Sequence, residues 1–253
     1  MRVGLVVYGP LDDRSGGYRY DLELVRGLRD AGDEVRVVSL PERPYRQRLR
    51  DNLTAQRRLS GLDVDVVLQD ELCHPSLAAV NPRLGDDTPL VSIVHHLNSL
   101  EAFRPWRRYV RRAIESRYLR SVDAFVFNSE TTRSTVEAVT EPGPNVVAHP
   151  AGDRFSSFGV PVDDDEIRAR STDGPLRIVA VGNLEPRKNV DGLLRALARV
   201  SGGWTLTVVG EPVDERYESS LHALADELGV SDRVTFTGRL SDADLAGTLR
   251  RSH

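Results

Sequence analysis

The residues that could do chemistry are gathered around a single lysine. Lys188 is the only lysine in the 253-residue chain, and the other 33 of its 34 basic residues are arginine. It lies in the loop Gly182–Asn189, between an apolar run expected to be a strand and an amphipathic pattern expected to begin a helix near Val190. Helix starts bind anions, and Arg187 adds a guanidinium that fits phosphate oxygens. We predict a phosphate or diphosphate site, the alternative being a solvated loop with incidental charges.

A pair of glycines follows the first expected strand. Gly16 and Gly17 lie just before a helical pattern that Ser15 could cap, and glycines allow a close approach of backbone to ligand. The spacing differs from the dinucleotide-binding pattern of three glycines, and a flexible surface loop is the alternative. Since ligands of open parallel sheets bind at the carboxyl ends of the strands, we expect this pair and Arg187–Lys188 to line opposite walls of one cleft.

Two histidines end the fourth expected strand. His95 could hydrogen-bond a substrate hydroxyl or assist charge development, and the alternatives are a buried structural histidine or a metal pair with His96. Neighbouring strand residues point to opposite faces, so we predict a functional His95 and a spacer at His96. Asn128 and Ser129 end the next strand, and we expect them chiefly to cap the helix that follows.

Aspartates are grouped at three places, which raises the possibility of a metal site. The groups are Asp63 with Asp65, the run Asp163–Asp165, and Asp242 with Asp244. None has a second cluster that would complete a ligand set, and acids are favoured at a helix start for another reason. We therefore predict no bound metal.

Two arginine-rich segments stand out in a chain of net charge −4. Arg104–Arg120 has seven arginines with interleaved aromatic residues, and Arg43–Arg58 has six. Arginine and aromatic residues on one helix are typical of contact with an anionic membrane, and they would also suit single-stranded nucleic acid. A solvated helix is the alternative. The overall acidity argues against a nucleic-acid partner, so we predict none.

The alternation of strand-like and helical patterns indicates an α/β fold. We predict two doubly wound, Rossmann-like units with parallel sheets, at residues 1–160 and 161–253, joined by a linker within residues 150–174. The second unit has only three expected strands and is predicted to be incomplete. Strands are expected at 3–8, 34–40, 64–69, 90–95, 124–127, 146–148, 176–181, 204–210 and 234–237, and helices at 18–31, 43–59, 75–80, 104–120, 130–139, 190–200, 216–228 and 242–251.

Composition narrows the class of protein further. The chain is 40% hydrophobic and 28% charged, which is typical of a soluble globular protein. Cys73 is its only cysteine, which excludes an internal disulfide and favours a reducing compartment. No apolar run approaches the ~18 residues of a membrane span, and the N-terminal run lacks a signal-peptide cleavage site. We predict a cytoplasmic protein.

In order and spacing, several of these segments together resemble the GT-B glycosyltransferases of family 4. The segments are the loop Gly182–Asn189, the Gly16–Gly17 pair, the strand ending in His95, Asn128–Glu130 and Ala148–Phe155. The resemblance implies two facing Rossmann-like domains, with the donor bound mainly by the second. It also implies that the family's donor-sugar glutamates would lie beyond residue 253, so that the chain is C-terminally truncated.

The resemblance implies a role for each candidate residue. Arg187 and Lys188 would bind the diphosphate of a nucleotide-sugar donor and stabilise the leaving group. His95 would act with them as a catalytic residue by contacting the transferred sugar or the acceptor. The remaining contacts to the diphosphate would come from Gly16, Gly17, Gly182 and Asn183. Gly210 and Gly238 would flank the nucleotide base. Asn183 departs from the family, which often has a basic residue there.

The reaction implied is retaining transfer of a hexose, of mannose or glucose type, to a lipid-linked or polysaccharide acceptor of the cell envelope. It would need no metal or cofactor, and charge stabilisation of the departing phosphate would be its main catalytic effect. The enzyme would work in the cytoplasm, at the inner face of the membrane if the arginine-rich helices bind lipid. The alternatives are an inactive remnant or sugar-nucleotide-binding module of the same fold, and, more weakly, a sugar-nucleotide epimerase.

Overall fold

The computed structural model describes residues 1–11, 15–84, 88–100, 104–150, 155, 164–172 and 174–253. The chain divides into two compact units, Met1–Pro150 and Ala151–His253, and each is described here by itself. The predicted boundary between residues 160 and 161 lies outside the described residues, as do Asp163 and residues 151–154 of the segment Ala148–Phe155.

The first unit is built on a six-stranded parallel sheet with the order β2-β1-β3-β4-β5-β6. Its strands are β1 (Arg2–Tyr8), β2 (Glu34–Leu40), β3 (Val66–Asp70), β4 (Leu90–Val94), β5 (Ala124–Phe127) and β6 (Asn145–Val147). Its helices are α1 (Gly16–Asp30), α2 (Tyr45–Arg48), α3 (Asn52–Leu59), α4 (His74–Leu77), α5 (Pro105–Leu119) and α6 (Glu130–Glu137).

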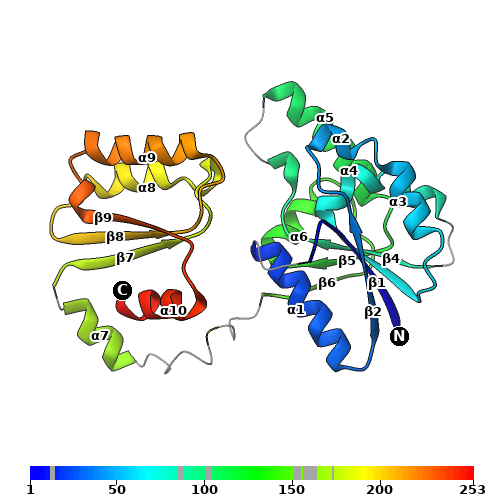
Figure 1. Ribbon diagram of the computed structural model, residues 1–253, viewed down its shortest axis with the longest axis horizontal. Helices are drawn as coiled ribbons and strands as arrows, with labels where there is room; N and C mark the ends of the chain where they lie inside the picture. Colours follow the sequence, from blue (N-terminus) through cyan, green and yellow to red (C-terminus); the bar gives the residue numbers. More distant parts are fainter. Residues whose placement is uncertain (12–14, 85–87, 101–103, 151–154, 156–163, 173) are drawn as a thin grey trace. The chain divides into compact units, whose positions relative to one another are not determined.

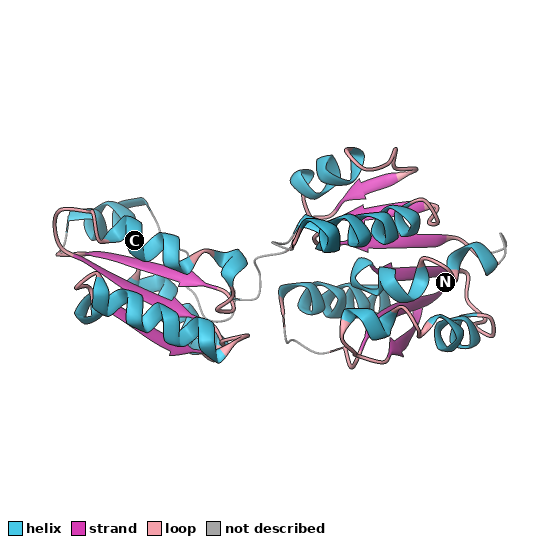
Figure 2. Cartoon of the chain, turned by 90° about the horizontal axis from the view of Figure 1, so that it is seen from above, coloured by secondary structure: helices cyan, strands magenta, loops and turns pink. Residues whose placement is uncertain are grey.

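Helices cover both faces of this sheet (Figures 1 and 2). Side chains alternate between the two faces along each strand, so each face contributes to a buried core. In β1, Val3, Leu5 and Val7 pack with Val25 of α1 on one face. Val6 and Tyr8 point to the other face, where they pack with residues of α3, α4, α5 and α6. The predicted doubly wound arrangement is confirmed for this unit.

The second unit has a three-stranded parallel sheet with the order β7-β8-β9. The strands are β7 (Leu176–Val181), β8 (Trp204–Val209) and β9 (Val234–Gly238), and the helices are α7 (Asp164–Thr172), α8 (Val190–Leu197), α9 (Glu215–Glu227) and α10 (Asp242–Arg251). Helices α8 and α9 cover one face of the sheet, with Leu194, Leu206 and Leu221 in the core between them. Helices α7 and α10 lie on the opposite face (Figure 1).

Two predictions of local structure are wrong. The helix expected over residues 43–59 is two helices, because the chain turns at residues 49–51, where the buried Asp51 pairs with Arg43 at 3.5 Å. The predicted linker contains α7, whose Arg170 donates to the carbonyl of Ser252 at 3.2 Å. This contact comes from residues more than 80 positions away, so local composition could not reveal it.

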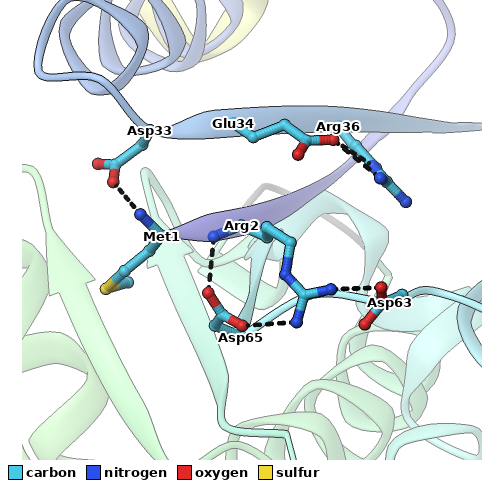
Figure 3. Close-up of polar contacts among 7 residues, drawn as sticks. All are labelled: Met1, Arg2, Asp33, Glu34, Arg36, Asp63 and Asp65. Carbon is cyan, nitrogen blue, oxygen red and sulfur yellow. Dashed lines mark hydrogen bonds and ion pairs between the residues drawn. The ribbon is translucent and has the colours of Figure 1, made fainter.

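The paired aspartates at the start of β3 have a structural role. The Arg2 guanidinium lies between Asp63 and Asp65, bonding Asp65 at 2.9 Å, while the backbone N–H of Arg2 donates to the other oxygen of Asp65 at 2.8 Å (Figure 3). These bonds hold the pKa of Asp65 below its usual value. The amino group of Met1 pairs with Asp33 at 2.6 Å at the same edge. The aspartates thus tie the start of β3 to β1.

Candidate functional site

Three glycines form a row at the carboxyl ends of the strands of the second unit. Gly182 donates its N–H to the carbonyl of Val209 at 2.9 Å, and Gly210 donates to the carbonyl of Gly238 at 2.9 Å. Gly210 has a φ of 153°, and a Cβ at this position would lie 2.0 Å from the carbonyl oxygen of Gly182. Only glycine fits such a contact. The three residues form a glycine edge at the carboxyl ends of the strands, where the lack of side chains on the glycines allows a ligand to approach the backbone.

The loop after β7 places Lys188 at this edge. Pro186–Lys188 form a 3₁₀ turn, and Asn189 then adopts a left-handed conformation with a φ of 53° before α8 begins. The Lys188 side chain folds back over Gly182, where an added Cβ would lie 3.3 Å from its Cε and 3.7 Å from its Nζ. Lys188 is an exposed residue, and its ammonium lies at the glycine edge, close in the chain to the N-terminus of α8. This arrangement suits an anion.

A second loop anchors the first. The backbone N–H of Leu184 donates to the carbonyl of Glu211 at 2.8 Å, and the Leu184 carbonyl accepts from Val213 at 3.1 Å. The Leu184 side chain is buried in the core of the unit. The loop that carries Lys188 is therefore held by backbone hydrogen bonds to the second loop and by the packing of the Leu184 side chain in the core.

The loop contains two other residues predicted to bind the diphosphate through their own groups, Arg187 and Asn183. Arg187 is exposed and its Nη2 pairs with Glu185 Oε1 at 2.5 Å, so part of its guanidinium is already engaged by a carboxylate. Asn183 is exposed, and its backbone nitrogen would lie 3.0 Å from a Cβ added at Gly210. The structure thus brings together Gly182, Asn183, Lys188, Gly210 and Gly238, with Arg187 in the same loop.

In the first unit, His95 follows β4 directly. The strand ends at Val94, one residue earlier than predicted. The nearby strands β1 and β3 are where the strand order reverses, which is the place where open α/β sheets bind ligands. His95 Nε2 donates to Asp21 Oδ1 at 3.0 Å, and its carbonyl accepts from Asn128 Nδ2 at 3.1 Å. The ring is therefore held from α1 and its backbone from the end of β5.

The glycine pair begins α1 and does not precede it. Ser15 caps the helix by accepting from the N–H of Tyr18, as predicted. A Cβ added at Gly17 would lie 3.3 Å from the His95 ring, whereas one at Gly16 would meet no described residue within 4 Å. The structure therefore brings Gly17 together with His95, and Gly16 lies apart from them at the exposed start of the helix. Ser129 caps α6 by accepting from Thr132, which confirms its predicted role.

Sequence reasoning missed two carboxylates beside His95. Asp21 and Asp70 are fully buried, and within the described part of the chain each has one oxygen, Oδ2, without a hydrogen-bond partner. Oxygens of both lie within 4.8 Å of each other and of a His95 ring nitrogen. Burial raises the pKa of Asp70 to about 8, and the charge of Asp21 adds to this. Such spacing would also suit a cation, but a proton on Asp70 is enough to relieve the repulsion.

The same charges act on His95. Burial lowers its pKa, but the hydrogen bond to Asp21 and the negative charges of Asp21, Asp70 and Glu71 outweigh burial and leave the pKa above its usual value. The sequence contained an indication of Asp70, because this residue is the last of β3 and His95 directly follows β4. The carboxyl ends of parallel strands lie at the same end of the sheet. Asp21 lies between Tyr18 and Val25 on the buried face of α1, at helical spacing.

A second buried polar cluster adjoins this site. Glu71, His74 and Glu115 are all buried. His74 Nδ1 donates to the carbonyl of Glu71 at 3.0 Å, its Nε2 accepts from the Tyr45 hydroxyl at 3.1 Å, and Ser99 donates to Glu115. Burial lowers the pKa of His74 to about 4, so the ring is neutral at physiological pH.

His74 should make the first unit sensitive to acid. Its pKa is about 4 when folded and 6.5 when unfolded, so its contribution to stability is complete above pH 6.5 and is lost as the pH falls towards 4. The pKa difference corresponds to about 3 kcal/mol. In urea denaturation at several pH values, the His74→Gln variant should lose less stability than the wild type between pH 6.5 and 4. Equal losses in both proteins would contradict this assignment, and comparing the two removes the opposite contribution of Asp70.

Comparison with known proteins places both units in one class of enzymes. Residues 14–151, more than half of the chain, match the family model described as Glycosyltransferase Family 4, and residues 163–253 match the model described as Glycosyl transferases group 1. One curated relative is the GDP-mannose-dependent alpha-(1-6)-phosphatidylinositol monomannoside mannosyltransferase of Mycobacterium tuberculosis. It is 29% identical over 198 residues, which cover 75% of this chain and 49% of the relative. The chain therefore spans about half the length of this relative.

Solved structures show the same fold. Sucrose-phosphate synthase from Thermosynechococcus elongatus matches 99% of this chain and 73% of its own, with a TM-score of 0.74 and 16% identity. Anabaena HepE in complex with UDP-glucose matches 96% of this chain and 70% of its own, with a TM-score of 0.68 and 18% identity. These likenesses confirm the predicted GT-B class for the fold.

Proposed function

Because the chain belongs to glycosyltransferase family 4, we propose that it transfers a hexose from a nucleotide-diphosphate sugar to a lipid-linked or polysaccharide acceptor, with retention of anomeric configuration. The observation that carries the proposal is the position of Lys188, whose ammonium lies over the glycine edge beside the start of α8. A donor diphosphate at this edge would meet a cation and free backbone N–H groups. The diphosphate leaving group would be stabilised there as the glycosidic bond breaks.

The donor is proposed from chemistry shared with relatives. The mannosyltransferase relative is named for GDP-mannose, and HepE was solved with UDP-glucose. We propose a hexose of one of these two types, bound with Gly182, Asn183, Arg187 and Lys188 at the diphosphate and Gly210 and Gly238 towards the base. His95, Gly16 and Gly17 are proposed to meet the sugar and diphosphate from the first unit.

A donor screen on the 253-residue chain tests the proposal. We expect GDP-mannose or UDP-glucose to raise its melting temperature and, with acceptor extracts, to be consumed with release of the nucleoside diphosphate. Binding without consumption would favour the alternative, a nucleotide-sugar-binding module. The absence of any binding would contradict both. We propose that no metal takes part, so EDTA should leave binding and turnover unchanged.

Helix α5 is the surface that we propose to meet an anionic membrane from the cytoplasmic side. Trp106, Tyr109 and Val110 are exposed on it, at 54%, 77% and 45% of their surfaces. Its single acid, Glu115, is buried, so it is not part of the exposed surface that carries most of the arginines. The segment Arg43–Arg58 supports this less, because Arg48 stacks on Tyr8 and Arg58 donates to the Ser39 carbonyl. In the described part of the chain, no helix has the length and apolar character of a membrane span.

Liposome flotation tests this surface. The wild type should float with vesicles containing anionic phospholipid and remain at the bottom with neutral ones. The double variant Trp106→Ser and Tyr109→Ser should lose about 10-fold in partitioning, because each exposed aromatic ring contributes burial in the interface. The matched control is Leu249→Ser in the second unit, which is exposed at 37%. Equal flotation with both lipids would contradict the proposal.

A further inference from the structure

Two buried carboxylates, Asp21 and Asp70, lie beside the ring of His95, and Asp21 accepts a hydrogen bond from it. Asp21 projects from α1, Asp70 ends β3 and His95 follows β4, so three elements bring these groups together. Both carboxylates are fully buried, and among the described residues each retains an oxygen without a hydrogen-bond partner, an arrangement that costs free energy of folding. The His95 side chain is 11% exposed, so the ring forms the boundary between this buried pair and solvent.

The two ring nitrogens of His95 differ in their hydrogen bonding. Nε2 donates to Asp21 at 3.0 Å, and among the residues that the structure describes Nδ1 has no hydrogen-bond partner. Gly17 packs against the Cδ2 edge of the ring, since a Cβ there would be 3.3 Å away, and Tyr20 meets the ring edge-on with the ring centres 5.1 Å apart. The tautomer and the orientation of the ring are therefore both set from α1.

We propose that Asp21 is the positioning residue of His95: with Asp70 behind it, it holds the proton on Nε2 and fixes the ring so that Nδ1 is the nitrogen that meets the substrate. This inference rests on the proposed function, in which His95 contacts the transferred sugar or the acceptor. The groups that face the ring are Asp21 and Tyr20 from α1, and Asp70 and Glu71 from the end of β3. The negative charge of Asp21 favours a proton on Nε2, which leaves Nδ1 as the ring nitrogen for the substrate.

Histidine ring ¹⁵N NMR tests the positioning without relying on turnover. The chain has six histidines, and the spectrum of a His95→Gln variant identifies the His95 signals. In the wild type we expect the Nε2–H form and a titration midpoint above that of the exposed histidines. Asp21→Asn should lower the midpoint by about one pH unit, because it removes the charge and keeps the size. Asp30→Asn, an exposed aspartate at the end of the same helix, is the matched control and should change nothing.

Kinetics of donor consumption provide the second readout. Asp21→Asn should lower kcat about 10-fold to 100-fold through misplacement of the ring. It should leave the donor KM within about 2-fold, since donor affinity depends mainly on the Lys188 loop. A purely structural role would change the folded fraction and leave the His95 midpoint and the ratio of kcat to KM as they are. If Asp21→Asn fails to fold, the tautomer of the wild type decides, and a neutral His95 ring with its proton on Nδ1 would overturn the positioning role.

The outcomes separate this inference from the proposed function. An unchanged His95 midpoint in folded Asp21→Asn would overturn the positioning role. A midpoint that falls as expected would support it, and a matching loss of kcat would support it further. If the midpoint falls but the wild type neither consumes donor nor shows a His95 shift on adding it, the proposed function fails and the Asp21–His95 interaction remains.

Discussion

Replacing Lys188 by alanine should weaken the binding of UDP or GDP by about 10-fold to 100-fold, because a charge-assisted hydrogen bond contributes about 1.5–3 kcal/mol. The ammonium lies over Gly182 at the glycine edge, and the backbone of the loop is anchored elsewhere, through Leu184. The substitution should therefore remove the charge and leave the loop in place. Isothermal titration of the chain with each nucleotide measures the effect.

Two further variants show whether the effect is specific. Arg199→Ala removes an exposed cation just beyond the end of α8 and should leave nucleotide affinity unchanged. Lys188→Arg keeps the charge and should recover part of the affinity, although a guanidinium does not reproduce the compact ammonium. Equal affinities of the wild type and Lys188→Ala would show that the nucleotide does not bind at this loop.

Replacing Gly210 by alanine should destabilise the second unit by about 3 kcal/mol or more, since a methyl group cannot be placed there without moving the backbone. The Cβ would lie 2.0 Å from the carbonyl oxygen of Gly182, and the φ of 153° is unfavourable for any side chain. Urea denaturation, followed by the fluorescence of Trp204 in the core of this unit, gives the free energy of unfolding.

The matched control for this substitution is Gly229→Ala. Gly229 lies in the same unit with a φ of 67°, but an added Cβ would meet nothing within 4 Å. It should cost only about 1 kcal/mol, the expense of the left-handed conformation. Similar losses in the two variants would mean that the close contact between Gly210 and Gly182 does not determine the structure of this edge.

The fold could be predicted because its signals are local. Apolar runs of strand length alternate with amphipathic helices, and caps such as Ser15 and Ser129 lie at helix starts. The loop around Lys188 was predictable for the same reason, since strand, turn, basic pair and helix follow one another directly. The helix α7 was missed because its hydrogen bond from Arg170 to the Ser252 carbonyl joins residues far apart in the chain, which local composition does not reveal.

The carboxylates of the first unit could not be predicted in this way. An aspartate in an amphipathic helix is usually exposed, but Asp21 lies on the buried face of α1 and its partner His95 is 74 positions away in the chain. The sequence pointed to the histidine but not to the group that holds it. Asp63 and Asp65 illustrate the opposite case, because a pair that suggested a metal serves to fix Arg2.

The central claim is that a nucleoside diphosphate binds at Lys188, and amine labelling tests it most directly. The chain has one lysine and one N-terminal amine, and the latter pairs with Asp33 in the first unit. An amine-reactive acylating agent followed by peptide mass spectrometry therefore reads two sites, one at the loop and one as an internal control. At a nucleotide concentration ten times the Kd, acylation of Lys188 should slow about 10-fold while that of Met1 stays constant. Unchanged acylation of Lys188 under saturating UDP and GDP would contradict the account.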